Sequence, residues 1–134
     1  MNKSSDKELR SPMLQCLKRI IGGLSEKLQT VKNQVEKNTG KKLNLEVISI
    51  FQKADDDFRI KVRGISFSGH AVEKEFQVVW WGHTCPTSFH LLRWDHFKFD
   101  FIYCGVIAAN PEILAKEIAI YTYGKQIPEV LSRY

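Results

Sequence analysis

The sequence of 134 residues has little that points to a membrane, a disulfide framework or secretion. Its longest apolar stretches, such as 101–109, are far shorter than the roughly 20 residues of a membrane-spanning helix. Its three cysteines are odd in number and irregularly spaced, unlike a disulfide-stapled domain. Residues 1–10 are polar throughout and lack the apolar segment of a secretory signal. We therefore expect a cytoplasmic protein with reduced thiols that does not enter a membrane.

The sequence also lacks the common motifs of catalysis and metal binding. It has no glycine-rich phosphate loop, no CxxC or HExxH and no GxSxG. His83, Cys85, His90 and His96 fall within 14 positions, but their spacing matches no standard zinc motif. Cys85 beside a histidine could form a nucleophile–base pair, although one such neighbour is common by chance. We expect a protein that is not an enzyme and that holds no metal and no cofactor.

What the sequence does have is ample material for one hydrophobic core. Hydrophobic residues make up 43% of the chain, and they include eight Phe, four Tyr and three Trp. A chain of this length buries roughly two-thirds of its unfolded surface, so it needs no staple. We expect a single domain over residues 11–134, preceded by a flexible polar tail at 1–10.

The positive charge is unevenly distributed. The net charge is +5, yet residues 1–42 hold ten basic and four acidic side chains, whereas residues 43–134 hold ten and eleven. The excess therefore lies in the N-terminal region. Such a segment can attract nucleic acid, but a solvated helix face is the simpler interpretation.

The N-terminal region has the apolar spacing of one long helix. Ser11 and Pro12 suit the cap and the first position, and Gly40 suits the end. Gly22 and Gly23 lie off the apolar stripe and could mark a bend or a break. The stripe could form a coiled-coil seam with a second chain, but packing on the protein's own sheet is favoured because the flanking positions lack complementary acids. Its members are Leu14, Leu17, Ile21, Leu24, Leu28, Val31 and Val35.

From residue 43 the apolar period changes to two, which predicts strands. We expect strands at 43–51, 58–63, 72–81 and 89–101, the last bent or interrupted near 95–96 and able to continue to 107. A second helix starts at Asn110 and Pro111 and ends near Gly124, with one further helical turn after Pro128. The predicted fold class is α+β in the order α-β-β-β-β-α: a long helix on one face of a curved four-stranded antiparallel meander, followed by a C-terminal helix.

The candidate binding residues lie on the predicted strands and their loops. Trp80 and Trp81 are adjacent, so on a strand their side chains point to opposite faces. One can enter the core, and the other must be covered by a helix, a ligand or another protein. Large aromatic side chains of this kind are enriched in binding surfaces. The aromatic candidates are Trp80, Trp81, Trp94, His83 and His90.

Arg59, Lys61 and Arg63 form a basic stripe on the second strand. Beside aromatic side chains such a stripe could bind single-stranded nucleic acid. Pairing with Glu73 and Glu75 across the strands is the favoured explanation.

We therefore expect a non-enzymatic interaction protein that presents an aromatic-rich sheet face or edge to a protein partner or to a second copy of itself. One alternative is a small-molecule binder or minor enzyme, with a pocket between sheet and helix lined by the tryptophans and histidines. The other is a nucleic-acid-binding protein that uses residues 1–42 and the basic stripe.

Overall fold

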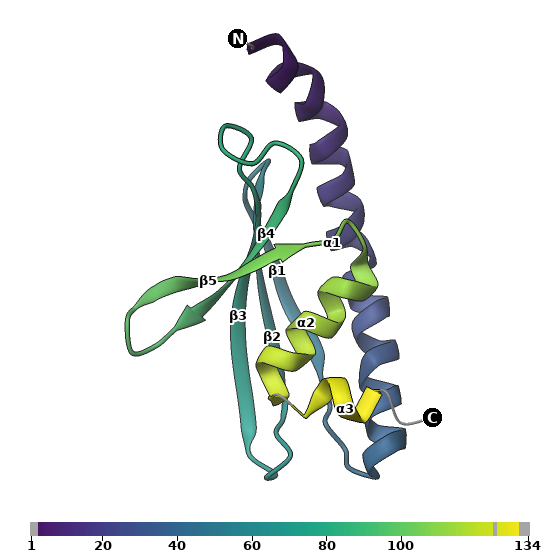
Figure 1. Ribbon diagram of the computed structural model, residues 1–134. Coiled ribbons are helices and arrows are strands. Elements are labelled where there is room, and N and C mark those ends of the chain that lie inside the picture. Colours follow the sequence, from purple (N-terminus) through teal and green to yellow (C-terminus); the bar gives the residue numbers. More distant parts are fainter. Residues whose placement is uncertain (1–2, 125, 132–134) are drawn as a thin grey trace.

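The computed structural model describes residues 3–124 and 126–131 and has an α+β fold (Figure 1). Five antiparallel strands form one sheet in the order β1-β2-β3-β4-β5, so the meander is confirmed and the expected number of four strands is wrong. The elements are α1 (Lys3–Thr39), β1 (Glu46–Ala54), β2 (Asp57–Ile65), β3 (Ala71–Trp80), β4 (Phe89–Asp95), β5 (Asp100–Ile107), α2 (Pro111–Tyr123) and α3 (Ile127–Leu131).

The additional strand arises because the chain reverses at the point where the sequence predicted only a bend. The carboxylate of Asp95 accepts hydrogen bonds from the backbone N–H groups of Phe97 and Lys98, at 2.8 and 3.2 Å. Such a side chain replaces the backbone bonds of a strand and closes a turn. Phe99 completes the turn with a φ of 51°, and the alternating Phe97-Lys98-Phe99-Asp100-Phe101 pattern hid this reversal.

Alternation along the strands separates the two faces of the sheet as predicted. On β2, Phe58, Ile60 and Val62 are buried against the helices, and Arg59 and Lys61 lie on the opposite side. The first strand begins at Glu46 rather than at Leu43. Leu43 is buried, but Asn44 has a φ of 50°, which interrupts an extended strand.

α1 begins at Lys3, so the predicted start at Ser11 and Pro12 is wrong and residues 3–10 are helical. Pro12 lies inside the helix on its exposed side, where it removes one backbone hydrogen bond. Arg10 holds this region to the β1–β2 turn through two hydrogen bonds to the Asp55 carboxylate, at 2.9 and 2.7 Å. Its guanidinium also lies 5.8 Å from the centre of the Trp80 ring.

The double glycine of α1 marks a helix contact and neither breaks nor ends the helix. A Cβ atom on Gly23 would lie 3.0 Å from the Pro111 side chain, whereas one on Gly22 would meet nothing within 4 Å. Pro111 is the first residue of α2, so the start of α2 presses against α1 where α1 has no side chain. Gly23 therefore allows the two helices to approach closely.

The remaining helix ends follow the sequence. Gly40 has a φ of 72° directly after α1. The Asn110 side chain caps α2 by accepting from the Glu112 N–H at 2.8 Å, and Gly124 follows the last turn. α3 begins at Ile127, beside the predicted start after Pro128; residues 132–134 lie outside the described part of the chain.

The helices form one layer against one side of the sheet (Figure 1). α1 contacts β1 and β3, α2 packs against α1 and β3, and α3 against α1 and α2. Six of the seven predicted stripe residues of α1 are buried in the core that results, and Leu14 is half-buried. Over residues 3–124 and 126–131, no helix combines the length and the apolar character that crossing a bilayer requires.

Candidate functional site

The side of the sheet opposite the helices, here called the outer face, carries the polar and aromatic residues that the core does not use. Strand register places these side chains in rows that run across the sheet. Its main members are Phe51, Arg59, Lys61, Arg63, Glu73, Glu75, Gln77, Val79, His90, Leu92, Trp94, Phe101 and Tyr103.

Near β4 the outer face is covered by the protein's own aromatic side chains. Trp81 stacks on His90 with ring centres 4.4 Å apart, and the Tyr103 ring lies 5.8 Å from Trp81. His90 Nδ1 and the Tyr103 hydroxyl form a hydrogen bond of 2.9 Å. His90 is only 2% exposed as a result, and its Nε2 atom has no hydrogen-bond partner among the described residues. Burial lowers the pKa of His90, because the protonated ring would lose hydration.

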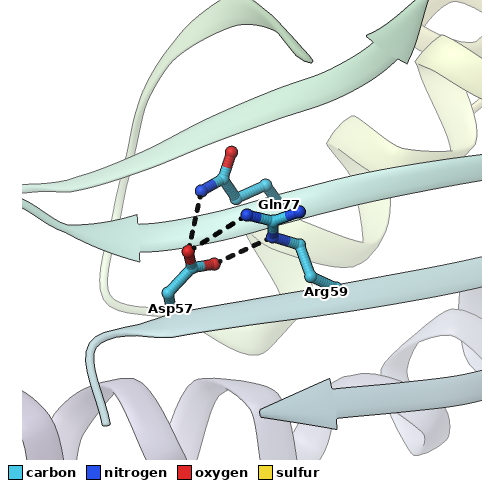
Figure 2. A network of polar contacts seen from close by, with 3 residues as sticks. All are labelled: Asp57, Arg59 and Gln77. Carbon is cyan, nitrogen blue, oxygen red and sulfur yellow. Dashed lines mark hydrogen bonds and ion pairs between the residues drawn. The ribbon is translucent and has the colours of Figure 1, made fainter. Parts of the chain in front are cut away.

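A polar network lies at the centre of the outer face (Figure 2). Arg59 Nε and Nη2 donate to the two carboxylate oxygens of Asp57, at 3.1 and 3.2 Å, and Gln77 Nε2 donates to the same carboxylate at 3.1 Å. The side chains of Asp57 and Arg59 are mostly buried, and the Arg59 guanidinium lies 4.5 Å from the centre of the Phe101 ring. The network therefore fixes Arg59, and through it Phe101, in place.

The register supports cross-strand pairing for the rest of the basic stripe. Lys61 lies opposite Glu75 and Arg63 lies opposite Glu73. Arg63 also donates to Glu46 of β1 at 2.8 Å. Each basic side chain of the stripe thus has an acidic neighbour, which reduces the positive potential that a phosphate backbone would meet.

A shallow groove of about 360 Å³ lies on the outer face over β1, β2 and β3. Phe51 lies at this groove with 62% of its surface exposed. The full lining is Ser49, Phe51, Lys53, Arg59, Lys61 and Glu75.

The turn between β4 and β5, here called the hairpin tip (residues 95–100), carries the most exposed large apolar side chains described. Phe97 is 97% exposed and Phe99 is 78% exposed. The hairpin extends away from the helix layer (Figure 1). Trp94 supports it from the outer face, since its ring packs edge-on against Phe101 at 5.2 Å and its Nε1 donates to His96 Nδ1 at 3.3 Å. The two hydrogen bonds that the Asp95 carboxylate accepts from the tip backbone lower the pKa of Asp95.

The structure separates the sequence-predicted aromatic candidates. Trp80 is in the core: it is 2% exposed, and its Nε1 donates to the Pro86 carbonyl at 2.9 Å. Trp81 takes the opposite side, as adjacent strand positions require, and stacks on the buried His90. His83 is exposed in the β3–β4 loop, and Trp94 is half-buried on the outer face.

The histidines and cysteines do not come together. All three cysteines are free. Cys85 lies in a turn where its backbone N–H bonds the Trp81 carbonyl at 2.8 Å. Within the described ranges, no three His, Cys, Asp or Glu side chains are placed to hold a metal ion.

Sequence reasoning missed Phe51, Lys53 and the separate role of Phe97 and Phe99. The signal for the tip was the Asp95 residue that starts a turn two positions before Phe97. Phe51 gave no signal, because its exposure depends on β1 being at the edge of the sheet. Comparison of the chain with protein-family models, with curated protein sequences and with solved structures finds no match.

Proposed function

We propose that this protein is a non-enzymatic interaction protein that binds another polypeptide chain through the outer face of its sheet and the hairpin tip. The observation that carries the proposal is the one-sided packing of the fold. The described helices lie on one face, and large apolar side chains remain exposed on the other side and at the tip. Groups of this kind usually mark a binding surface, because leaving them in water is unfavourable.

The interior argues against the small-molecule alternative. Leu24, Ile60 and Phe76 are fully buried, so side chains fill the space between α1 and the sheet. A hollow of about 440 Å³ does lie at the seam of α1 with β1 and β2, but no predicted tryptophan or histidine lines it. Its lining is Gln29, Lys32, Asn44, Leu45, Glu46, Arg63, Gly64 and Ile65.

A photocrosslinking experiment tests the proposal in cells of the source organism. A photoreactive phenylalanine analogue is placed at Phe51 or Lys53, both exposed at the groove on the outer face, and at the exposed Ser25 of α1 as a control. We expect discrete adducts heavier than the 15.5 kDa chain from the two outer-face positions and none from Ser25. Absence of adducts at the outer face, or the same adducts from Ser25, would contradict the proposal.

A further inference from the structure

The hairpin tip has the properties of an anchor that enters another surface. Phe97 and Phe99 are adjacent to solvent on almost all sides, and no ring or cation contact to either occurs within the described residues. Phe99 has a φ of 51°, a region that asparagine or glycine adopts at lower cost than phenylalanine. Phe99 is 78% exposed, so the isolated chain gains little burial from a phenylalanine there, and a contact outside the chain would account for it.

The tip is also supported by contacts within the chain. Asp95 fixes its backbone with two hydrogen bonds, and Trp94 packs on Phe101, which the Arg59 guanidinium contacts. An anchor that is already ordered loses little conformational entropy on binding. This favours insertion into a formed groove on a partner protein.

The groove on the outer face is complementary to the tip in charge. Around the groove, Lys53, Arg59 and Lys61 face the two carboxylates of Asp57 and Glu75, which leaves a net charge of +1. The remaining cation is Lys53, since Asp57 is bonded to Arg59, and Glu75 lies opposite Lys61.

The tip has the opposite balance. Within residues 95–100, Asp95 and Asp100 outnumber the one cation Lys98. Arg93 also acts on Asp95, but its guanidinium lies over the Tyr121 ring of α2, so the solvent-facing tip keeps a net charge of −1. Opposite net charges at two surfaces favour their encounter and fix their relative orientation. The exposed Phe51 ring beside the groove gives the tip phenylalanines an apolar surface to contact.

We propose that the partner of the outer face is a second copy of this chain, in a two-fold dimer in which the hairpin tip of each copy occupies the groove of the other. This inference rests on the proposed function and specifies its partner. Aromatic side chains bury roughly 150–250 Å² each, so Phe51, Phe97 and Phe99 of both copies supply on the order of 1,000 Å². That is about the minimum for a specific interface.

Sedimentation of the purified full-length chain tests the dimer. We expect a concentration-dependent species of twice the 15.5 kDa chain mass. A tip variant, Phe97→Ser with Phe99→Asn, keeps the turn, because asparagine tolerates the φ of 51°. It should raise the dissociation constant at least tenfold, as should a groove variant, Phe51→Ser. The control Ile113→Ser removes an exposed apolar side chain from α2 and should leave dimerisation unchanged.

Mixing the tip variant with the groove variant provides the sharpest test. Each variant alone has both tip–groove contacts damaged, whereas the mixed dimer has one intact contact. The mixture should therefore associate more strongly than either variant alone. Circular dichroism before sedimentation confirms that the variants are folded.

A native chain that remains monomeric up to about 1 mM would overturn the dimer. So would native association in the tip and groove variants, or a mixture no stronger than its components. If the chain is monomeric while the Phe51 photocrosslink captures a different polypeptide, the second-copy inference fails and the proposed function stands. If the chain is monomeric and no outer-face adduct forms, both fail.

Discussion

The two adjacent glycines of α1 provide a matched pair of substitutions that tests how α2 packs on α1. Gly22→Ala and Gly23→Ala make the same chemical change one residue apart in one helix. A new Cβ at Gly22 meets open space, and a new Cβ at Gly23 lies 3.0 and 3.1 Å from the Cγ and Cβ atoms of Pro111. Both contacts are shorter than carbon atoms normally allow.

The two substitutions should change stability by different amounts. Alanine is better than glycine in a helix by about 1 kcal/mol, so Gly22→Ala should raise the free energy of unfolding by about that amount. Gly23→Ala has the same helix gain, but the Pro111 ring is rigid and begins α2, so the start of α2 has to shift by a few tenths of an ångström. Such overpacking costs about 1–3 kcal/mol. The net result for Gly23→Ala should be between no change and a loss of about 2 kcal/mol.

Urea unfolding followed by circular dichroism measures both variants, and an unchanged slope confirms that stability alone differs. Gly23→Ala combined with Pro111→Gly should be more stable than Pro111→Gly alone by about 1 kcal/mol, because glycine has neither the Cβ nor the Cγ atom that the new methyl group would meet. Equal stabilisation by the two alanines would refute the reasoning, as it would mean that the start of α2 does not press on Gly23. Absence of coupling between positions 23 and 111 would do the same.

Three further predictions concern the buried interior. Gly64→Ala should lower the free energy of unfolding by about 3 kcal/mol in the same urea assay, because its Cβ would lie 2.6 Å from the Tyr123 hydroxyl and 2.9 Å from the Leu43 carbonyl oxygen. Tyr123→Phe should cost about 1 kcal/mol, since it removes the 3.1 Å hydrogen bond to that carbonyl; a neutral result would mean that the bond adds nothing. Burial lowers the pKa of His90, so below about pH 6.5 the unfolded chain binds a proton that the folded chain excludes, and stability should fall as the pH decreases from about 7 to 5. His90→Phe should reduce this fall, whereas the same change at the exposed His70 should not.

Local periodicity was enough to predict the helix–sheet core. The 3-4 spacing of α1 and the alternation of β2 each reflect burial on one side of a regular element, so they can be read without knowing the partner element. The two ends of α2, at Asn110 and Gly124, could be predicted equally well, because capping depends on residues adjacent in sequence. The start of α1 was different: the Ser11-Pro12 signal is valid locally, but the helix continues before it, and Arg10 bonds Asp55, 45 residues away.

The candidate site was harder to predict because it depends on which side chains the fold leaves uncovered. The sequence indicated that Trp80 and Trp81 take opposite sides, but not which one enters the core. Trp80 enters the core because the β3–β4 loop covers it. Its indole N–H donates to the Pro86 carbonyl, and Gly82 lies so close to the ring that a Cβ atom added there would be 2.7 Å from it. Phe97 and Phe99 fit the alternating pattern of a strand in the sequence, but in the structure they lie in the turn that Asp95 closes, outside the sheet.

The aromatic residues of the outer face and the hairpin tip fall into two groups, and the difference between them is the strongest argument for an external partner. Trp81, Tyr103 and Phe101 have partners within the chain, because they cover His90 or hold Arg59. Their presence is accounted for by the stability of the monomer. Over the described residues, Phe51, Phe97 and Phe99 make no ring or cation contact, and they lie at the groove and at the tip. Replacing this second group should therefore leave unfolding nearly unchanged while it weakens binding at least tenfold, whereas replacing the first group should lower stability. If the second group proved equally important for folding, these side chains would belong to the monomer and the argument for a partner would be lost.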